Sequence, residues 1–100
     1  MTITIYHNPR CSKSRATLEI IQSKGITPNI VEYLHTPPDP DTLEKIARLI
    51  GVPLGELLRR NEDDFVAAGD DVPLDDETAL ARWLHDHPRV LERPIVVDDD

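Results

Sequence analysis

The chain has 100 residues, which suits one domain with one core, and an apolar fraction of 39%, which is low but adequate for a small globular domain. No apolar stretch approaches the length of a membrane span or of a signal peptide's apolar region, so we expect a cytoplasmic protein that does not bind membranes. A single cysteine excludes an internal disulfide and cysteine-based metal clusters, and a net charge of −8 disfavours binding to nucleic-acid phosphates.

The first third of the chain predicts two strands joined by a helix. Residues 2–6 alternate apolar and polar side chains, as a strand does, and Asn8-Pro9 marks a turn. A helix is predicted from Cys11 to Lys24, and residues 29–34 form the second strand. The buried side of this helix is expected to consist of four apolar residues, Ala16, Leu18, Ile20 and Ile21. A helix of this length between two strands predicts a βαβ unit with parallel strands.

A proline-rich connector over residues 35–40 separates this unit from a second helix. Asp41 is the predicted cap of that helix, and Glu44, three residues on, completes the pattern of a capping box. Gly51 is the expected end of the helix, because glycine adopts the backbone conformation that closes one.

The remaining sequence predicts further helices and a short last strand. Residues 53–58 look like a short helix, and the acidic residues 62–72 form a loop or an irregular helix. Another helix is expected to start at Asp75 or Asp76 and to stop at His87-Pro88, and residues 95–97 form a strand. The order strand, helix, strand, helices, strand is typical of an α/β domain.

The lone thiol lies in a cationic segment of an acidic protein. Residues 1–18 contain Arg10, Lys13 and Arg15 and no acidic residue, a net charge of +3, so the other 82 residues carry −11. Such an island favours a small anion that reaches the thiol. The alternative is a chance cluster of cations on a solvated helix face.

Cys11 is the candidate nucleophile because it lies where the first helix begins. Unpaired backbone N–H groups at a helix start, and cations nearby, favour the thiolate and can also hold an oxyanion. The alternative is that Cys11 is a small buried apolar residue. Its polar neighbours Arg10, Ser12 and Lys13 argue against that alternative.

Three residues around Cys11 are candidates for a supporting role. His7 precedes the turn and could either stabilise the thiolate or satisfy the turn backbone. Asn8 can make a local turn hydrogen bond. Ser14 lies three residues after Cys11, so its hydroxyl could bond to the thiolate. It also occupies the place where a second cysteine would complete a C-x-x-C pair, so any redox chemistry needs an external thiol.

Distant arginines could contact an oxyanion, because the guanidinium offers forked donors. The candidates are Arg59 and Arg60, which follow Leu57-Leu58, and Arg93, which precedes Pro94. Taken alone, each is more readily interpreted as a surface residue than as an oxyanion contact. No pattern of histidines or cysteines indicates a metal site.

Four collinear segments resemble one known family, the ArsC-like, glutaredoxin-coupled arsenate reductases of the thioredoxin-fold superfamily. Residues 5–15, Ile-Tyr-His-Asn-Pro-Arg-Cys-Ser-Lys-Ser-Arg, resemble the active-site segment of that family. Residues 33–38, 57–59 and 93–97 match its Tyr-Leu-x-x-Pro-Pro, Leu-Leu-Arg and Arg-Pro-Ile-Val-Val motifs. The resemblance covers nearly the whole chain.

The resemblance implies an α/β, thioredoxin-like fold with a small mixed sheet, flanking helices and a helical insertion between the second and third strands. It implies one domain over residues 1–100 that lacks the C-terminal strand, third active-site arginine and C-terminal helix usual in the family. It also implies that Cys11 is the nucleophile and that Arg59 and Arg93 contact the oxyanion. His7 and Ser14 match thiolate-tuning positions. Asn8, Arg15 and Pro94 are supporting residues, with Pro94 at the position of a cis proline.

The implied reaction is the reduction of arsenate to arsenite by the thiolate, with glutathione as co-substrate, glutaredoxin as protein partner and no bound cofactor. We expect a monomer. One alternative is a glutathione-dependent thiol reductase of another small substrate. Another is a non-enzymatic regulator of the same superfamily, although such regulators resemble C-x-x-C switches and Ser14 argues against one.

Overall fold

The computed structural model describes residues 2–98 and shows an α/β arrangement in two compact units. The first unit comprises the residues up to Thr36 together with those from Arg93 onward, and the second is Pro37–Glu92. The units are treated separately below. The expectation of one domain over residues 1–100 stays a prediction.

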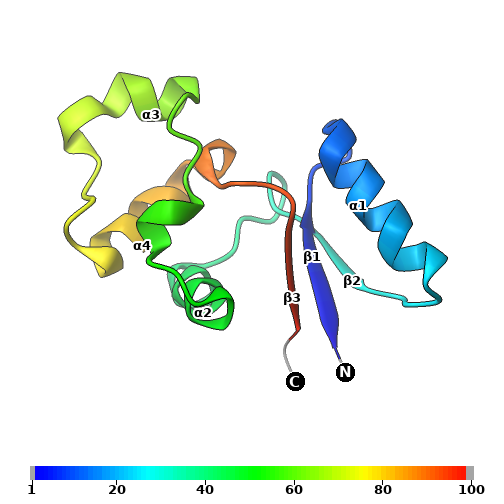
Figure 1. The fold of residues 1–100 in the computed structure, drawn as a ribbon. Helices are drawn as coiled ribbons and strands as arrows, with labels where there is room; N and C mark the ends of the chain where they lie inside the picture. Colours follow the sequence, from blue (N-terminus) through cyan, green and yellow to red (C-terminus); the bar gives the residue numbers. More distant parts are fainter. Residues whose placement is uncertain (1, 99–100) are drawn as a thin grey trace. The chain divides into compact units, whose positions relative to one another are not determined.

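The first unit is built on a mixed sheet with the strand order β2-β1-β3 (Figure 1). Strand β1, Ile3–His7, pairs in parallel with β2, Asn29–Glu32, and antiparallel with β3, Ile95–Asp98. The parallel pairing confirms the predicted βαβ unit. As the central strand, β1 is buried along most of its length, and it ends at the buried side chain of His7.

Helix α1, Ser12–Ser23, follows β1 and packs against it, but with a different face from the one predicted. Ala16 is exposed and the side chain of Ile20 is 57% exposed, so these two assignments to the buried side are wrong. Ser14 is fully buried, and Leu18 and Ile21 are half-buried. These three positions follow the i, i+4, i+7 spacing of one helix face, so the stripe that meets the sheet is centred on a serine.

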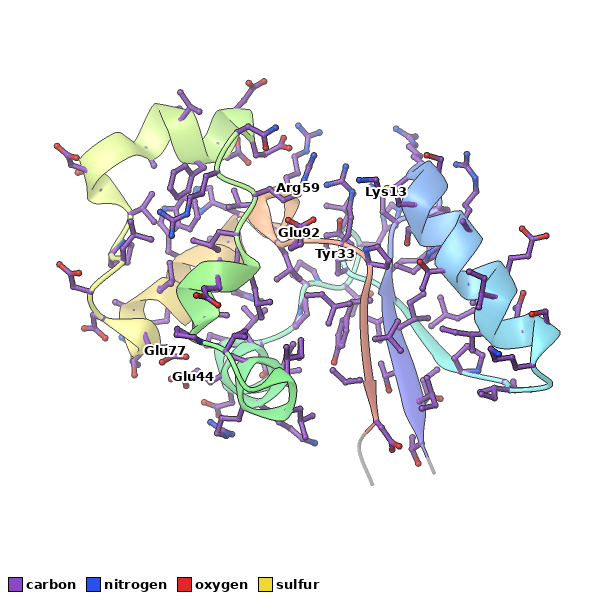
Figure 2. The ribbon with its side chains drawn as sticks, in the orientation of Figure 1. Lys13, Tyr33, Glu44, Arg59, Glu77 and Glu92 are labelled. Carbon is purple, nitrogen blue, oxygen red and sulfur yellow. The ribbon has the colours of Figure 1, made fainter. Side chains whose placement is uncertain are left out.

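The second unit is a helical insertion between β2 and β3, as predicted. Its elements, in chain order, are α2 (Pro40–Ile50), η1 (Leu54–Leu57), α3 (Asp63–Ala68), η2 (Gly69–Asp71), α4 (Glu77–Asp86) and η3 (Pro88–Val90). Helices α2 and α4 pack together, and apolar residues of each are fully buried. Polar contacts join the same elements: the Thr78 hydroxyl lies 3.4 Å from Glu44 Oε1, and Glu77 Oε1 accepts from the Leu54 N–H at 3.2 Å (Figure 2).

The cap of α2 is Asp39, not Asp41. The Asp39 carboxylate accepts the Thr42 N–H at 2.8 Å, and Pro40 occupies the first turn. Proline suits that place because it has no N–H to leave unpaired. The predicted capping box between Asp41 and Glu44 is therefore wrong, whereas Gly51 ends the helix as predicted, with a φ of 86°.

Within residues 2–98, no helix is long and apolar enough to cross a membrane.

Candidate functional site

A tight turn carries the chain from β1 into α1 and places Cys11 at the helix start. The Cys11 N–H donates to the Asn8 carbonyl at 3.0 Å, and the Arg10 N–H donates to Asn8 Oδ1 at 3.0 Å. The Arg15 guanidinium donates from Nη1 to the Pro9 carbonyl at 2.8 Å. Asn8 and Arg15 thus bind the backbone of the turn from both sides, which gives the two residues a structural role.

Cys11 is the N-cap residue of α1, with extended backbone angles and a partly exposed side chain. No N–H of the described residues completes a capping hydrogen bond to the thiol sulfur. The pKa of the thiol is nevertheless lowered, chiefly by the backbone N–H of Ser14; burial opposes this with the second-largest effect, and the backbone N–H of Lys13 lowers the pKa further. These N–H groups stabilise negative charge on the sulfur, so the helix start favours the thiolate in the direction that the sequence predicts.

Arg93 is the cation that acts on this sulfur. Its charge and its side-chain hydrogen bond to Cys11 both lower the thiol pKa, after the effects of the two N–H groups. The side chain is half-buried at the start of β3, and its Nε lies out of contact with solvent. The peptide bond between Arg93 and Pro94 is cis, as the resemblance implied.

Ser14 and His7 form a buried pair beside the turn. His7 Nδ1 lies 2.6 Å from Ser14 Oγ, and the Asn8 N–H donates to the same oxygen at 3.0 Å. The Ser14 hydroxyl, which the sequence suggested could bond to the thiolate, meets His7 and Asn8 in the structure. It is the backbone N–H of Ser14 that favours the thiolate.

Arg59 belongs to the second unit, two residues after the end of η1 (Figure 2). Its Nη1 donates to Glu62 Oε2 at 2.8 Å, and both side chains are about one-quarter exposed. Arg60 instead donates to the Gly55 carbonyl at 3.2 Å and lies over the ring of Phe65. A partly exposed ion pair of this kind is weak, so a stronger anionic ligand can displace Glu62 from Arg59.

The structure brings the sequence-predicted residues of the first unit into one cluster around Cys11. The residues that share it are His7, Asn8, Cys11, Ser14, Arg15 and Arg93, and Pro94 follows Arg93 across the cis peptide bond. The sequence did not reveal that the side chain of Ser14 ties the helix to β1, because a residue type does not show which way its hydroxyl points. Among residues 2–98, no group of three histidine, cysteine or acidic side chains is placed to hold a metal ion.

Arranged in this way, the cluster can attack an electrophile and hold an oxyanion. The thiolate supplies the nucleophile, the helix N–H groups supply donors for oxygen, and Arg93 supplies a positive charge. Arg10 and Lys13 are exposed and lie within two residues of Cys11 in the sequence, so they add positive charge at the start of α1.

Residues 6–100 match the model of the ArsC family. An arsenate reductase of Neisseria meningitidis is 46% identical to the chain over 96 residues, which are 95% of this chain and 82% of that protein.

Solved structures agree with this match. A Yersinia pestis protein provisionally named an arsenate reductase superimposes with a TM-score of 0.88 at 42% identity, over 97% of this chain and 86% of its own. An arsenate reductase from Vibrio cholerae gives a TM-score of 0.85 at 33% identity, over 99% of this chain and 85% of its own. These likenesses confirm the thioredoxin-like fold implied by the sequence motifs.

Proposed function

The chain belongs to the ArsC family, and from this premise we propose that it is an arsenate reductase that uses Cys11 as its nucleophile. The observation that carries the proposal is the place of Cys11 at the start of α1, where the N–H groups of Ser14 and Lys13 and the charge of Arg93 lower the pKa of its thiol. A thiolate among oxyanion donors is what arsenate, a tetrahedral oxyanion with an electrophilic centre, requires.

In this proposal arsenate binds at the start of α1. Its oxygens accept from the N–H groups of the first helical turn and from the Arg93 guanidinium. The family resemblance adds Arg59 as a further oxyanion contact. These donors offset negative charge that develops on oxygen during attack.

The reaction then proceeds by thiol substitution at arsenic. The Cys11 thiolate forms an S–As bond, and one arsenate oxygen leaves as water after protonation. The thiol of glutathione displaces a second oxygen, also as water. A glutaredoxin thiolate next attacks the glutathione sulfur, which gives a mixed disulfide and leaves the electron pair of the broken S–As bond on arsenic. Arsenic is thereby reduced from As(V) to As(III), and hydrolysis releases arsenite and the Cys11 thiol.

The need for an external thiol in this proposal follows from the number of cysteines. Cys11 is the one cysteine in the sequence, so the second sulfur of any disulfide has to come from another molecule. Glutathione and glutaredoxin fill this role by family resemblance. We place the reaction in the cytoplasm, where such thiols are kept reduced.

The test is arsenite formation from arsenate by the wild-type chain, with glutathione and glutaredoxin supplied together or one at a time. Wild type should turn over only with both thiols, and Cys11→Ser should abolish turnover. Ser12→Ala, which alters an exposed residue in the same helical turn, is the matched control and should keep wild-type activity. Wild type that forms no arsenite but reduces a glutathione mixed disulfide would replace arsenate with another small substrate.

A further inference from the structure

Main-chain hydrogen bonds of the second unit hold the backbone at Arg59. The Arg59 N–H donates to the Val90 carbonyl at 2.6 Å, and the Glu92 N–H donates to the Leu57 carbonyl at 2.8 Å. These two bonds join the segment that follows η1 to the segment that follows η3. Arg59 therefore extends its side chain from a backbone that is fixed on the side of its own N–H.

The guanidinium of Arg59 meets an anion of its own chain across a tight turn. Arg59 Nη1 donates to Glu62 Oε2 at 2.8 Å, and the Glu62 N–H donates to the Arg59 carbonyl at 3.1 Å. Among residues 2–98, Glu62 is the one acceptor of the Arg59 side chain. Because a guanidinium has five N–H donors, most of those of Arg59 can serve a ligand.

Glu62 turns its carboxylate to Arg59 although it is the N-cap residue of α3. Its backbone is extended, with a φ of −69° and a ψ of 142°, but its side chain makes no capping hydrogen bond. A carboxylate at a helix start is usually stabilised by the N–H groups of the first turn. Here the carboxylate is bound to Arg59 instead, so the contact with the guanidinium is preferred to the one with the helix.

We propose that Glu62 is a specificity-determining residue, whose carboxylate competes for Arg59 with external anions and excludes those that carry a single charge. Oxyanions of higher charge displace it. Glu62 acts through Arg59 and does not contact the reacting atoms. The inference rests on the proposed function only in taking Arg59 as an oxyanion contact.

This competition favours multiply charged oxyanions for two reasons. Glu62 is joined to Arg59 through the turn, so its carboxylate has a high effective concentration and a free monoanion competes poorly with it. A dianion such as sulfate or doubly ionised arsenate is attracted to the guanidinium about twice as strongly by Coulomb's law. The side chains of Arg59 and Glu62 are 25% and 21% exposed, so their ion pair is weak enough to be exchanged.

The experiment titrates the nitrogen-15-labelled chain with sodium sulfate at constant ionic strength and follows the Arg59 Nε–H signal by NMR. Sulfate is an inert tetrahedral dianion, so the Kd is obtained without arsenate reduction. The test variant is Glu62→Gln, which keeps an acceptor oxygen and removes the charge. The matched control is Asp63→Asn, because Asp63 is the exposed neighbour of Glu62 and forms no ion pair among the described residues.

Glu62→Gln should bind sulfate about two- to fivefold more tightly than wild type, or about 0.4–1.0 kcal/mol at 1.4 kcal/mol per tenfold change. Asp63→Asn should keep a Kd close to that of wild type. Sodium acetate carries the same single charge as Glu62. It should leave the Arg59 signal of wild type unchanged at concentrations at which sulfate shifts it, and should shift that signal in Glu62→Gln.

A Kd in Glu62→Gln that equals or exceeds the wild-type value would show that Glu62 holds Arg59 in place and does not compete, which would overturn the proposal. An equal gain in Asp63→Asn would overturn it as well, because any lost negative charge would then have the same effect. So would an Arg59 signal that sulfate never shifts, or one that acetate shifts as readily in wild type. The comparison of acetate with sulfate uses wild type and does not depend on whether a variant folds.

The two proposals fail in distinguishable ways. A chain that binds sulfate as expected but forms no arsenite would contradict the proposed reductase activity and leave the role of Glu62 intact. A chain that reduces arsenate but has the same sulfate Kd with and without the Glu62 charge would contradict only the role of Glu62.

Discussion

Replacing Ser14 with alanine should destabilise the protein by about 2–3 kcal/mol. The change removes the oxygen that both His7 Nδ1 and the Asn8 N–H meet, and leaves these two polar groups without that partner. A buried polar group left unsatisfied costs about 1–3 kcal/mol. His7 is 6% exposed and incurs most of this cost, whereas Asn8 is half-buried, so water can partly replace its lost bond. Alanine is the better helix former, which offsets up to about 0.5 kcal/mol.

The assay is reversible urea unfolding of Ser14→Ala and of the matched control Ser12→Ala, followed by far-ultraviolet circular dichroism. Ser12 is exposed in the same turn, so its replacement should change the free energy of unfolding by no more than about 0.5 kcal/mol. Since a domain of this size is stable by about 5–15 kcal/mol, Ser14→Ala should still fold. If the two variants unfold with the same free energy, the buried hydroxyl does not stabilise the turn and the reasoning from its two bonds is refuted.

Three further predictions concern Cys11, Arg59 and Asp39. Folding lowers the pKa of Cys11, so its thiolate should stabilise the folded protein above the ordinary thiol pKa of about 8.5. This added stability should be lost as the pH falls through the lowered pKa. Urea unfolding across that pH range should therefore show a pH-dependent difference in the free energy of unfolding between wild type and Cys11→Ser. Arg59→Ala should raise the KM for arsenate about tenfold or more, as expected for the loss of a charge-assisted hydrogen bond. Arg60→Ala should leave KM nearly unchanged, because the Arg60 guanidinium contacts Gly55 and Phe65. Equal KM values in the two variants would show that Arg59 does not contact arsenate. Asp39→Ala should lower the Tm more than Asp41→Ala, because Asp39 caps α2. The loss of Tm in Asp39→Ala should vanish at acid pH. The Thr42 N–H lowers the pKa of the Asp39 carboxyl, and protonation of that carboxyl removes the charge that the N–H stabilises.

The order of elements could be predicted from the sequence because local signals agree with one another. Alternating residues in β1, the Asn8-Pro9 turn and the glycines after α1 and α2 each determine the conformation of a short stretch. The cap of α2 was misassigned because Asp39 and Asp41 both offer a carboxylate. Pro40 was the signal that favours Asp39, since proline prefers the first helical position.

The packed face of α1 could not be chosen from periodicity alone. Apolar residues are usually buried and polar residues exposed, but here Ile20 is 57% exposed and Ser14 is fully buried. What buries Ser14 is its pairing with His7 and Asn8, residues that lie before the helix. The periodicity of a helix depends only on residues within that helix. It therefore does not indicate a hydrogen bond between a helix residue and the preceding strand or turn.

The placement of Cys11 was predictable for the opposite reason, because its chemistry depends on its own helix start. The acidity of the thiol comes first from backbone N–H groups, which every helix start provides, and afterwards from Arg93, which is 82 positions away in the sequence. The local sequence therefore suffices to propose Cys11 as the nucleophile. The distant cation was identified only through a family motif, since neither charge nor spacing distinguished Arg93 from a surface arginine.

Ser14 is relevant both to the structure of the turn at Cys11 and to the need for an external thiol. It stands where a second cysteine would give an internal disulfide, and its hydroxyl is committed to His7 and Asn8. A thiol in its place would have a larger and more weakly hydrogen-bonding atom than the 2.6 Å contact with His7 accommodates. Gaining an internal resolving thiol at this position would therefore weaken the contacts that join the first turn of α1 to His7 and Asn8. On this reasoning, dependence on an external thiol follows from how the turn is held as well as from the cysteine count.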